Sequence, residues 1–334
     1  MTKTMRAVQY SGYGGGAAGL KHVEIPVPVV KKDYVLIRVE AVSINPHDWK
    51  IQDGYVRHVL PPRFPHTPGT DVAGEVVGLG LGVTTFSLGD KVVSCLGTSG
   101  GGLAEYALAH ISTTAKRPLG VTAIEGACLG DAAFSALQSV RDWAAVPLNG
   151  RKLKVPPNIL ITDAGGAVGT FAVQLAKLGG AHVTATCCEA KHLELVKSLG
   201  ADEVLDSKTP GGESLESPSG KKYDTVIQCG EYLSFAHIKP QLSPTGKVIN
   251  LTPSPKSMLL SAASLASFSK QKCIPFMPSA NTTDYYFLFS LMHQKKLKII
   301  VDSEFLLEQA EKAWAASIAG HATGKIVVKC TKCS

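Results

Sequence analysis

The chain has 334 residues, enough for two average domains, and its 45% hydrophobic and 18% charged residues are typical of a soluble globular protein. The net charge of +7 comes from scattered lysines and arginines, which argues against a nucleic-acid-binding tail, and no apolar run is long enough to cross a membrane. The eight cysteines follow no secretory signal, so we expect free thiols. Cys330 and Cys333 lack a second pair at zinc-site spacing, and we interpret them as part of a frayed tail.

The first part of the chain, up to about Pro118, predicts many short strands separated by glycine and proline turns. A short helix is expected to start at Asn45, and a proline-rich loop follows over 61–68. This succession indicates a compact, barrel-like β domain. The expected strands cover 5–10, 20–25, 34–43, 72–79 and 91–95.

The second part of the chain alternates strands with helices, which predicts a parallel sheet covered by helices on both faces. A helix over 124–140 is expected to link the two parts. From residue 297 the pattern leaves the sheet, and strands over 298–301 and 325–328 are expected to flank a helix over 304–318 and to return to the first domain. The expected strands of the parallel sheet are 159–161, 183–186, 203–205, 225–228, 247–251 and 273–277.

A glycine-rich turn lies between the first of these strands and the helix that follows it. A diphosphate has to meet the backbone N–H groups at a helix N-terminus, and a Cβ at the closest positions would hold it off. Gly166 and Gly169 therefore lie where the backbone must approach a phosphate or the strand. The strand–turn–helix–strand context indicates a dinucleotide site; the alternative is an ordinary βαβ unit without a ligand. The turn comprises Ala164, Gly165, Gly166, Ala167, Val168 and Gly169.

Several stretches of the sequence resemble the zinc-free quinone oxidoreductase branch of the medium-chain dehydrogenase/reductase superfamily, and in particular its plant chloroplast-envelope members. The resemblance covers essentially the whole chain. It implies a doubly wound Rossmann cofactor domain over 126–279 and a GroES-like β-barrel-type domain over 1–125 and 280–334. The stretches are SINPHDWKIQDG, PGTDVAGEVVGLGLGVTTFSLGDKVV, GGLAEYA, AVQLAKLGGAHVTATC, KSLGADEVLD and HATGKIVV, with QYSGYGGGAAGLKHVEIPVP and SPSGKKYDTVI for the envelope members.

The same resemblance suggests what the protein binds and where it works. It implies NADPH as cofactor and an enone or quinone as small-molecule substrate, with no nucleic acid. It allows a homodimer and a peripheral association with a membrane, and it places the protein in the cytoplasm or at the chloroplast envelope.

The positions that hold catalytic zinc in other members of the superfamily are occupied by Asn45 and Thr70. Zinc needs Cys, His or carboxylate ligands, and Asp71 alone cannot hold the metal. We therefore expect no metal. Zinc-free members reduce quinones or the C=C bond of α,β-unsaturated carbonyls by hydride transfer.

Three residues are candidates for catalysis. The Asn45 amide could donate to a developing enolate, and the Tyr55 phenol could donate a hydrogen bond or a proton. Asp131 replaces an apolar residue of relatives. The alternatives are a capping asparagine, a packed surface tyrosine and a surface aspartate.

The end of the second strand of the parallel sheet bears on the choice of cofactor. An acidic residue there binds the ribose 2′-OH of NAD, whereas a cation favours the 2′-phosphate of NADP. Both Glu189 and Lys191 are present, and we favour NADPH through Lys191, with Glu189 turned to solvent. The resemblance also assigns further residues to the cofactor, namely Asn45, Ser135, the whole turn from Ala164 to Gly169, Cys187, Cys229, Leu251 and Thr252.

Some positions depart from the family pattern, and they leave a second function open. Ala167 replaces a glycine of the turn, Ser207 replaces a tyrosine, and Asp131 is unusual in its helix. The alternative to a reductase is therefore a repurposed enzyme of plant specialised metabolism, or a pseudo-oxidoreductase with a non-redox or ligand-binding role.

Overall fold

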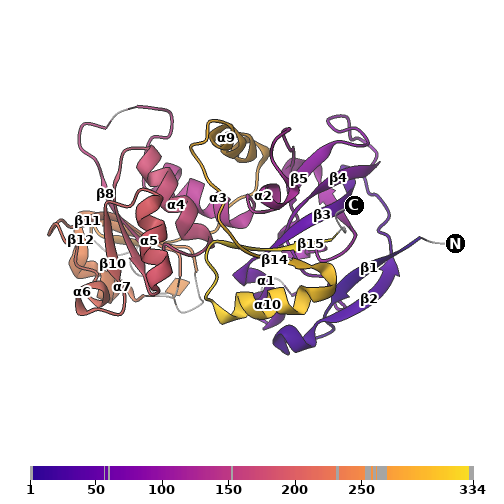
Figure 1. Cartoon of the computed structure of the whole chain (residues 1–334), viewed down its shortest axis with the longest axis horizontal. Helices are drawn as coiled ribbons and strands as arrows, with labels where there is room; N and C mark the ends of the chain where they lie inside the picture. The colour runs from indigo at the N-terminus through magenta and orange to yellow at the C-terminus, as the bar shows by residue number, and fades with distance from the viewer. Residues whose placement is uncertain are drawn as a thin grey trace. The chain divides into compact units, whose positions relative to one another are not determined.

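The computed structural model describes residues 3–55, 57–58, 61–151, 153–230, 233–252, 257–258, 261 and 269–330. The chain divides into two compact units, each built on a sheet of its own (Figure 1). None of the described helices is long and apolar enough to cross a membrane. The first unit comprises Met1–Ala132, Ala280–His293 and Val301–Ser334, and the second comprises Ala133–Ser279 and Gln294–Ile300.

The first unit contains a seven-stranded sheet in the order β14-β15-β3-β4-β5-β7, with β6 paired to β3. Only β14 and β15 run parallel; the other neighbours are antiparallel. Strands from the two ends of the chain thus lie side by side, yellow β15 against indigo β3 (Figure 1). A separate antiparallel pair joins β1 and β2. The strands are β1 (Thr4–Gln9), β2 (Lys21–Pro26), β3 (Tyr34–Ile44), β4 (Asp71–Leu79), β5 (Lys91–Cys95), β6 (Tyr106–His110), β7 (Thr114–Lys116), β14 (Val301–Leu306) and β15 (Lys325–Lys329).

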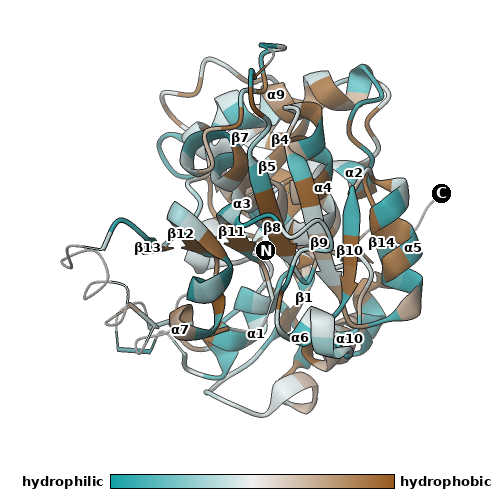
Figure 2. Ribbon diagram, turned by 90° about the vertical axis from the view of Figure 1, so that its left-hand side faces the viewer, coloured by the Kyte–Doolittle hydropathy of each residue, from teal (hydrophilic) through white to brown (hydrophobic). Residues whose placement is uncertain are grey.

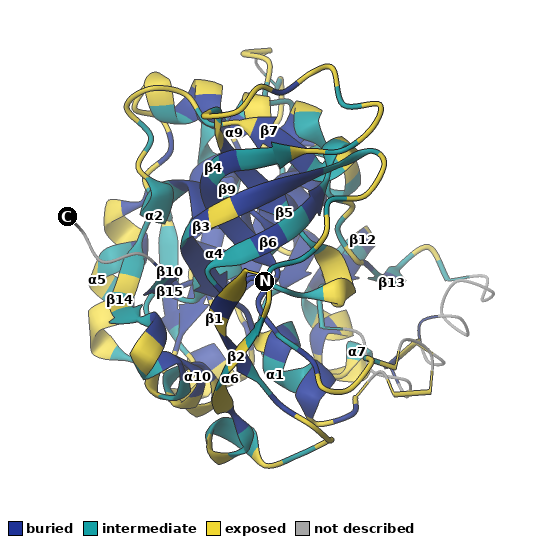
Figure 3. Ribbon diagram, turned by 90° about the vertical axis from the view of Figure 1, so that its right-hand side faces the viewer, coloured by how far each residue is buried: buried dark blue, intermediate teal, exposed yellow. Residues whose placement is uncertain are grey.

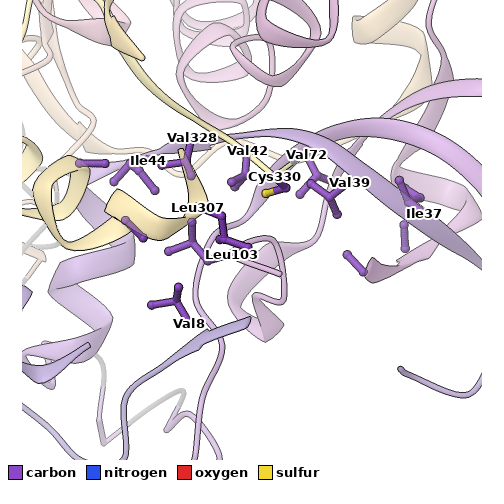
Figure 4. Close-up of a cluster of buried hydrophobic side chains, with 14 of the residues drawn as sticks. Val8, Ile37, Val39, Val42, Ile44, Val72, Leu103, Leu307, Val328 and Cys330 are labelled. Carbon is purple, nitrogen blue, oxygen red and sulfur yellow. The ribbon is translucent and has the colours of Figure 1, made fainter. Parts of the chain in front are cut away.

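The core of this unit is aliphatic and lies against β3, most of which is buried (Figures 3 and 4). Trp314 of α10 is fully buried in it, and its indole N–H donates to Gln52 of α1 at 2.9 Å. Cys330 also belongs to this core, with 3% exposure, so the interpretation of a frayed tail is wrong for Cys330. Cys333 lies outside the described residues. The helices are α1 (Pro46–Gln52), α2 (Ala123–Ala127), α9 (Thr282–His293) and α10 (Ala310–Ala319).

The second unit contains a six-stranded sheet in the order β10-β9-β8-β11-β12-β13, and every neighbouring pair is parallel. Its central strands are strongly hydrophobic (Figure 2), as strands buried on both faces require. The six predicted strands each overlap one strand of this sheet, and the predicted fold class is confirmed. The strands are β8 (Asn158–Thr162), β9 (His182–Cys187), β10 (Glu203–Asp206), β11 (Tyr223–Gln228), β12 (Leu242–Asn250) and β13 (Lys272–Pro275).

The order of these strands is that of a doubly wound sheet, in which the direction of winding reverses between β8 and β11. Ligands of such sheets bind at the carboxyl ends of the strands beside this switch point. The carboxyl end of β8 leads directly into the glycine-rich turn. The described helices of this part are α3 (Asp131–Gln138), α4 (Ala167–Leu178), α5 (Ala190–Ser198), α6 (Pro210–Glu213) and α7 (Phe235–Ile238).

Three predicted elements are wrong in their bounds. The linking helix over 124–140 is broken into α2 and α3 by a bend at Gly130, where the Asp71 carboxylate accepts the Asp131 N–H at 2.9 Å and leaves no room for a Cβ on the glycine. At the C-terminal end, the strand covers Val301–Leu306 instead of 298–301, and α10 starts only at Ala310. Residues 301–306 alternate half-buried and exposed side chains over their first four positions, a period of two that is typical of a strand.

Candidate active site

The turn after β8 has the geometry of a phosphate-binding loop. A Cβ on Gly169 would lie 2.5 Å from both the Ala164 Cα and the Asp163 carbonyl oxygen, so this glycine lets α4 approach the end of β8. Gly166 precedes α4, and the first N–H groups of a helix have no partner within it. Because α4 opens directly from this glycine turn, the site fits the diphosphate of a dinucleotide.

One residue of the turn, Gly165, and the residue that precedes the turn, Asp163, have roles that the sequence did not suggest. A Cβ on Gly165 would lie 2.4 Å from the ring of the buried His192, so the packing of α5 requires this glycine. Asp163 is exposed and has a left-handed φ of 50°. Its carboxylate lies beside Gly166, where it opposes the binding of an anion.

The end of β9 carries the residues that bear on cofactor choice. Cys187 ends the strand and is 2% exposed. Lys191 lies in the first turn of α5 and forms a 3.3 Å ion pair with Glu189, with exposed side-chain fractions of 53% and 25%. The expectation that Glu189 turns to solvent is therefore wrong, because Glu189 is the more buried partner of that pair.

The remaining predicted cofactor residues of the second unit follow neighbouring strands. The Cys229 N–H donates to the Thr162 hydroxyl at 3.2 Å, which ties the end of β11 to the end of β8. The Leu251 N–H donates to the Gln228 carbonyl at 3.2 Å, and the Thr252 hydroxyl donates to the Gly230 carbonyl at 3.2 Å. Cys229, Leu251 and Thr252 thus lie at the carboxyl edge that also carries the glycine turn. Ser135 is buried in α3.

In the first unit, Asn45 joins the end of β3 to the start of α1 and is 1% exposed. Its Oδ1 accepts a hydrogen bond from Lys325 Nζ at 2.5 Å. Its Nδ2 donates to Asp71 Oδ2 at 2.9 Å and to Thr70 Oγ1 at 3.3 Å. The amide is thus fully engaged within the protein, while its backbone N–H donates to the Asp48 carboxylate at 2.8 Å.

Asp71 is the centre of this network and is 1% exposed at the start of β4. Its Oδ2 also accepts the backbone N–H of Asp131 at 2.9 Å, which satisfies one of the free donors at the N-terminus of α3. Its Oδ1 has no hydrogen-bond partner among the described residues. Lys325, the first residue of β15, is 1% exposed and supplies the buried positive charge that Asp71 needs.

His47 forms the outer side of the network. Its Nδ1 lies 3.4 Å from Asp131 Oδ2, and its Nε2 lies 3.8 Å from Asp48 Oδ1. The Asp131 side chain is 31% exposed and paired with this imidazole, so it differs from an isolated surface aspartate. We call Asn45, His47, Asp48, Asp71, Asp131 and Lys325 the ionic cluster.

The ionic cluster shifts the pKa values of its members. Burial lowers the pKa of His47, but the carboxylates of Asp48 and Asp131 outweigh it and raise that pKa to about 10. Burial raises the pKa of Asp48 to about 6 despite the attraction of His47. Burial likewise raises the pKa of Asp71 against the attraction of Lys325. Burial would raise the pKa of Asp131, but His47 reverses the effect and lowers it.

Sequence reasoning named Asn45 and Asp131 as candidates but missed His47, Asp48 and Lys325, because the members of this cluster come from elements far apart along the chain. A signal for His47 and Asp48 was available in SINPHDWK, where they follow Asn45 beside a strand end. Tyr55, the other predicted catalytic residue, follows α1 with 45% of its surface exposed. Among the described residues, no group of three or more His, Cys, Asp or Glu side chains is arranged to hold a metal ion.

Comparison with known proteins identifies the family. Residues 31–119 match the alcohol dehydrogenase GroES-like domain, and residues 199–328, which exclude Asn45 and Thr70, match the family described as zinc-binding dehydrogenase. The chain is 53% identical over 328 residues to the chloroplastic quinone-oxidoreductase QR1 of Triphysaria versicolor. It is 51% identical over 328 residues to the chloroplast envelope quinone oxidoreductase homolog of Arabidopsis thaliana. Each alignment covers 98% of this chain and 99% of the relative.

The fold gives the same assignment. The solved structure of the quinone oxidoreductase from Coxiella burnetii matches with a TM-score of 0.84 at 26% identity, covering 98% of this chain and 100% of the other. The fold and both sequence matches define a medium-chain dehydrogenase/reductase. Within that superfamily, the chain belongs to the quinone oxidoreductase family.

Proposed function

We propose that the protein is an NADPH-dependent oxidoreductase that reduces quinones, or the activated C=C bond of α,β-unsaturated carbonyls, without zinc. The observation that carries this proposal is that the chain has both a glycine-built nucleotide turn and an ionic cluster in which the Asn45 amide is engaged by Thr70, Asp71 and Lys325. Such a protein can orient a conjugated acceptor but does not offer the strong Lewis acid that alcohol oxidation uses.

The residues that would hold the cofactor lie in the second unit. The backbone of the turn from Ala164 to Gly169 would hold the diphosphate, and Lys191 would bind the 2′-phosphate of NADPH. The bound cofactor supplies a hydride to the acceptor. A charge-assisted bond from Lys191 is worth about 1.5–3 kcal/mol, which corresponds to tenfold or more in affinity, but this lysine has first to leave Glu189.

Asn45 has a positioning role in this proposal. Both hydrogens of its amide are used by Asp71 and Thr70, so Asn45 acts by fixing Lys325 and Asp71 instead of donating to the substrate. Tyr55, of which 45% is exposed, stays a candidate donor to the substrate oxygen. Because the named relatives are chloroplastic, we also propose a location at the chloroplast envelope.

The experiment that tests this function is NADPH oxidation with quinones, enals and enones by the zinc-free protein, checked by elemental analysis. Deuteride from labelled NADPH should appear at the β-carbon of an enone product. Lys191→Ala should weaken NADPH binding by about tenfold and leave NADH binding nearly unchanged. Equal losses for the two cofactors would instead assign the choice to Glu189.

A second candidate function is favoured by the Asp163 carboxylate, which lies beside the glycine turn. The exposed Asp163 carboxylate beside Gly166, together with Ala167, makes the turn a poorer anion site than an all-glycine one. A repurposed enzyme or pseudo-oxidoreductase would tolerate weaker binding of the anionic diphosphate. Turnover of a substrate without any nicotinamide cofactor would establish this second function and overturn the reductase.

A further inference from the structure

We propose that His47 donates the proton that completes the reduction of a quinone, and that Asp131 is the positioning residue that holds its imidazole. This inference rests on the function proposed above. It names a catalytic group that lies outside the metal-ligand positions and outside the nucleotide turn, and it favours a quinone over an enone as substrate.

The first observation is exposure. Asn45, Asp48, Asp71 and Lys325 are each no more than 2% exposed, so none of them meets a substrate or exchanges protons with water directly. The side chains of His47 and Asp131 retain 34% and 31% exposure. Within the ionic cluster, only these two side chains can pass a proton between the buried charges and a molecule outside.

The second observation is the set of charges around the imidazole. Three carboxyl groups face it, from Asp48 of its own α1, Asp131 of α3 and Asp71 of β4, and their attraction dominates. Lys325 of β15 supplies the other positive charge of the cluster. The remaining titratable groups around Asp71 stay neutral at physiological pH, because burial raises the pKa of the Cys95 thiol, of the Cys128 thiol and of the Tyr285 phenol.

These charges keep His47 protonated at neutral pH. With three carboxyl groups and only one ammonium around it, the imidazolium offsets part of the negative charge of the cluster, and its pKa rises to about 10. A reduced quinone oxygen is a phenolate, and a phenol has a pKa of about 10. The imidazolium is therefore protonated at neutral pH and comparable in acidity to a phenol, so it can transfer its proton to a phenolate oxygen without a large uphill step.

The proton and electrons balance in this step. The hydride brings two electrons and one proton to the quinone, and the charge that develops on its oxygen is neutralised as the N–H bond of His47 breaks and an O–H bond forms. The product is a hydroquinone. The neutral imidazole then takes a proton back from water, which its exposed side allows, and Asp131 stabilises the restored imidazolium.

The alternative is that His47 only neutralises the buried carboxylates. The two roles differ in their kinetics, because a structural ion pair changes stability but adds no proton-transfer step to turnover. The test is therefore His47→Gln and Asp131→Asn in the full-length chain, with NADPH and a water-soluble 1,4-benzoquinone. His22→Gln is the matched control, because His22 forms a 3.0 Å pair with Glu311 elsewhere in the same unit.

The expected result is a kcat that falls by about 100-fold in His47→Gln, with little change in KM or in NADPH affinity measured by calorimetry. Wild-type kcat should fall above about pH 9 and should be slower in D₂O, and His47→Gln should lose both effects. Asp131→Asn should lower the His47 pKa measured by NMR and move the alkaline fall of kcat to lower pH. His22→Gln should match the wild type.

Three outcomes would overturn the proposal in different ways. Wild-type kcat and an unchanged pH profile in His47→Gln would assign His47 to charge balance alone. If His47→Gln does not fold, Asp131→Asn provides the test. A His47 pKa that NMR shows to be lowered in Asp131→Asn, together with an alkaline fall of kcat at the wild-type pH, would also assign His47 to charge balance alone. Absence of NADPH oxidation by the wild type would overturn the proposed function together with this inference.

Discussion

The glycine turn of the second unit and the ionic cluster of the first unit are two opposite ways of building a site. The turn is made from backbone, and its glycines are needed because side chains would collide with Ala164 and His192. The cluster is made from side chains, and four of its six members are almost completely buried. The turn occupies consecutive residues, whereas the cluster joins residues between 45 and 325.

This difference determines how each site depends on its residues. Within the turn, adding a single methyl group is enough to cause a collision, so the cost is steric and local. Within the cluster, removing one charge leaves its partners buried and unpaired, which is more costly than losing the pair itself. We therefore expect the largest effects in the cluster, with smaller ones in the turn.

The largest effect is expected from Lys325→Met, which keeps the length of the side chain but removes the buried ammonium. Asn45 Oδ1 would lose its hydrogen-bond donor, and the Asp71 carboxylate would lose the nearby positive charge, in a site with 1% exposure. Removing one partner of a buried pair costs about 3–5 kcal/mol, which chemical denaturation would measure. The matched control is Lys329→Met on the same strand, whose pair with Glu304 is partly exposed and should cost less than about 1 kcal/mol.

Equal losses in the two lysine variants would mean that the ionic cluster is not a coupled unit. A small loss in Lys325→Met would have the same meaning, because it would show that Asp71 becomes neutral without cost when the ammonium is absent. The raised pKa of Asp71 makes protonation the route by which such a rescue would occur.

The same difference explains what could be predicted from the sequence. The parallel sheet and the nucleotide turn were predicted because apolar runs, glycines and helix periodicity are local signals, and Gly169 has the close-packing role expected of it. The cluster was predicted only in part: Asn45 and Asp131 were named, but nothing local marks Lys325 as the partner of Asn45. His47 was passed over as one polar residue among several in a short helix.

The predicted bounds of helices and strands were wrong where contacts between distant parts of the chain override the local sequence pattern. The helix over 124–140 looked continuous from its small and apolar residues, but Gly130 packs against the Asp71 carboxyl group and the helix breaks. The pairing of Glu189 with Lys191 is a local contact that composition cannot reveal, since both orientations of Glu189 suit the same sequence.

A smaller effect is expected from Gly169→Ala, which tests the backbone site. The added methyl group would lie 2.5 Å from the Ala164 Cα and the Asp163 carbonyl, and neither backbone atom can move freely. Overpacking of this kind costs about 1–3 kcal/mol and should also weaken NADPH binding. Gly211→Ala is the control, because nothing lies within 4 Å of its Cβ position. Unchanged stability and NADPH affinity in Gly169→Ala would show that the turn is looser than its geometry indicates.

The smallest expected effect is the pH dependence of stability that His47 confers. The folded-state pKa of His47 is raised to about 10 from an ordinary value of about 6.5, so its stabilisation is complete below about pH 6.5 and is lost as the pH rises toward 10. Thiols of the unfolded chain titrate near pH 8.5, which makes pH 6.5–8.5 the window that isolates His47. Because the side chain is 34% exposed, solvent screens its pairs, and we expect a loss of about 1 kcal/mol across that window, or a fall in Tm of about 2–4 °C. The Tm of His47→Gln should not change over the same pH range, whereas the Tm of His22→Gln should fall with pH as that of the wild type does. A wild-type Tm that rises between pH 6.5 and 8.5 would show that the imidazole is neutral in the folded protein, and the contrast between a cluster of paired charged side chains and a turn built from backbone would then have to be given up.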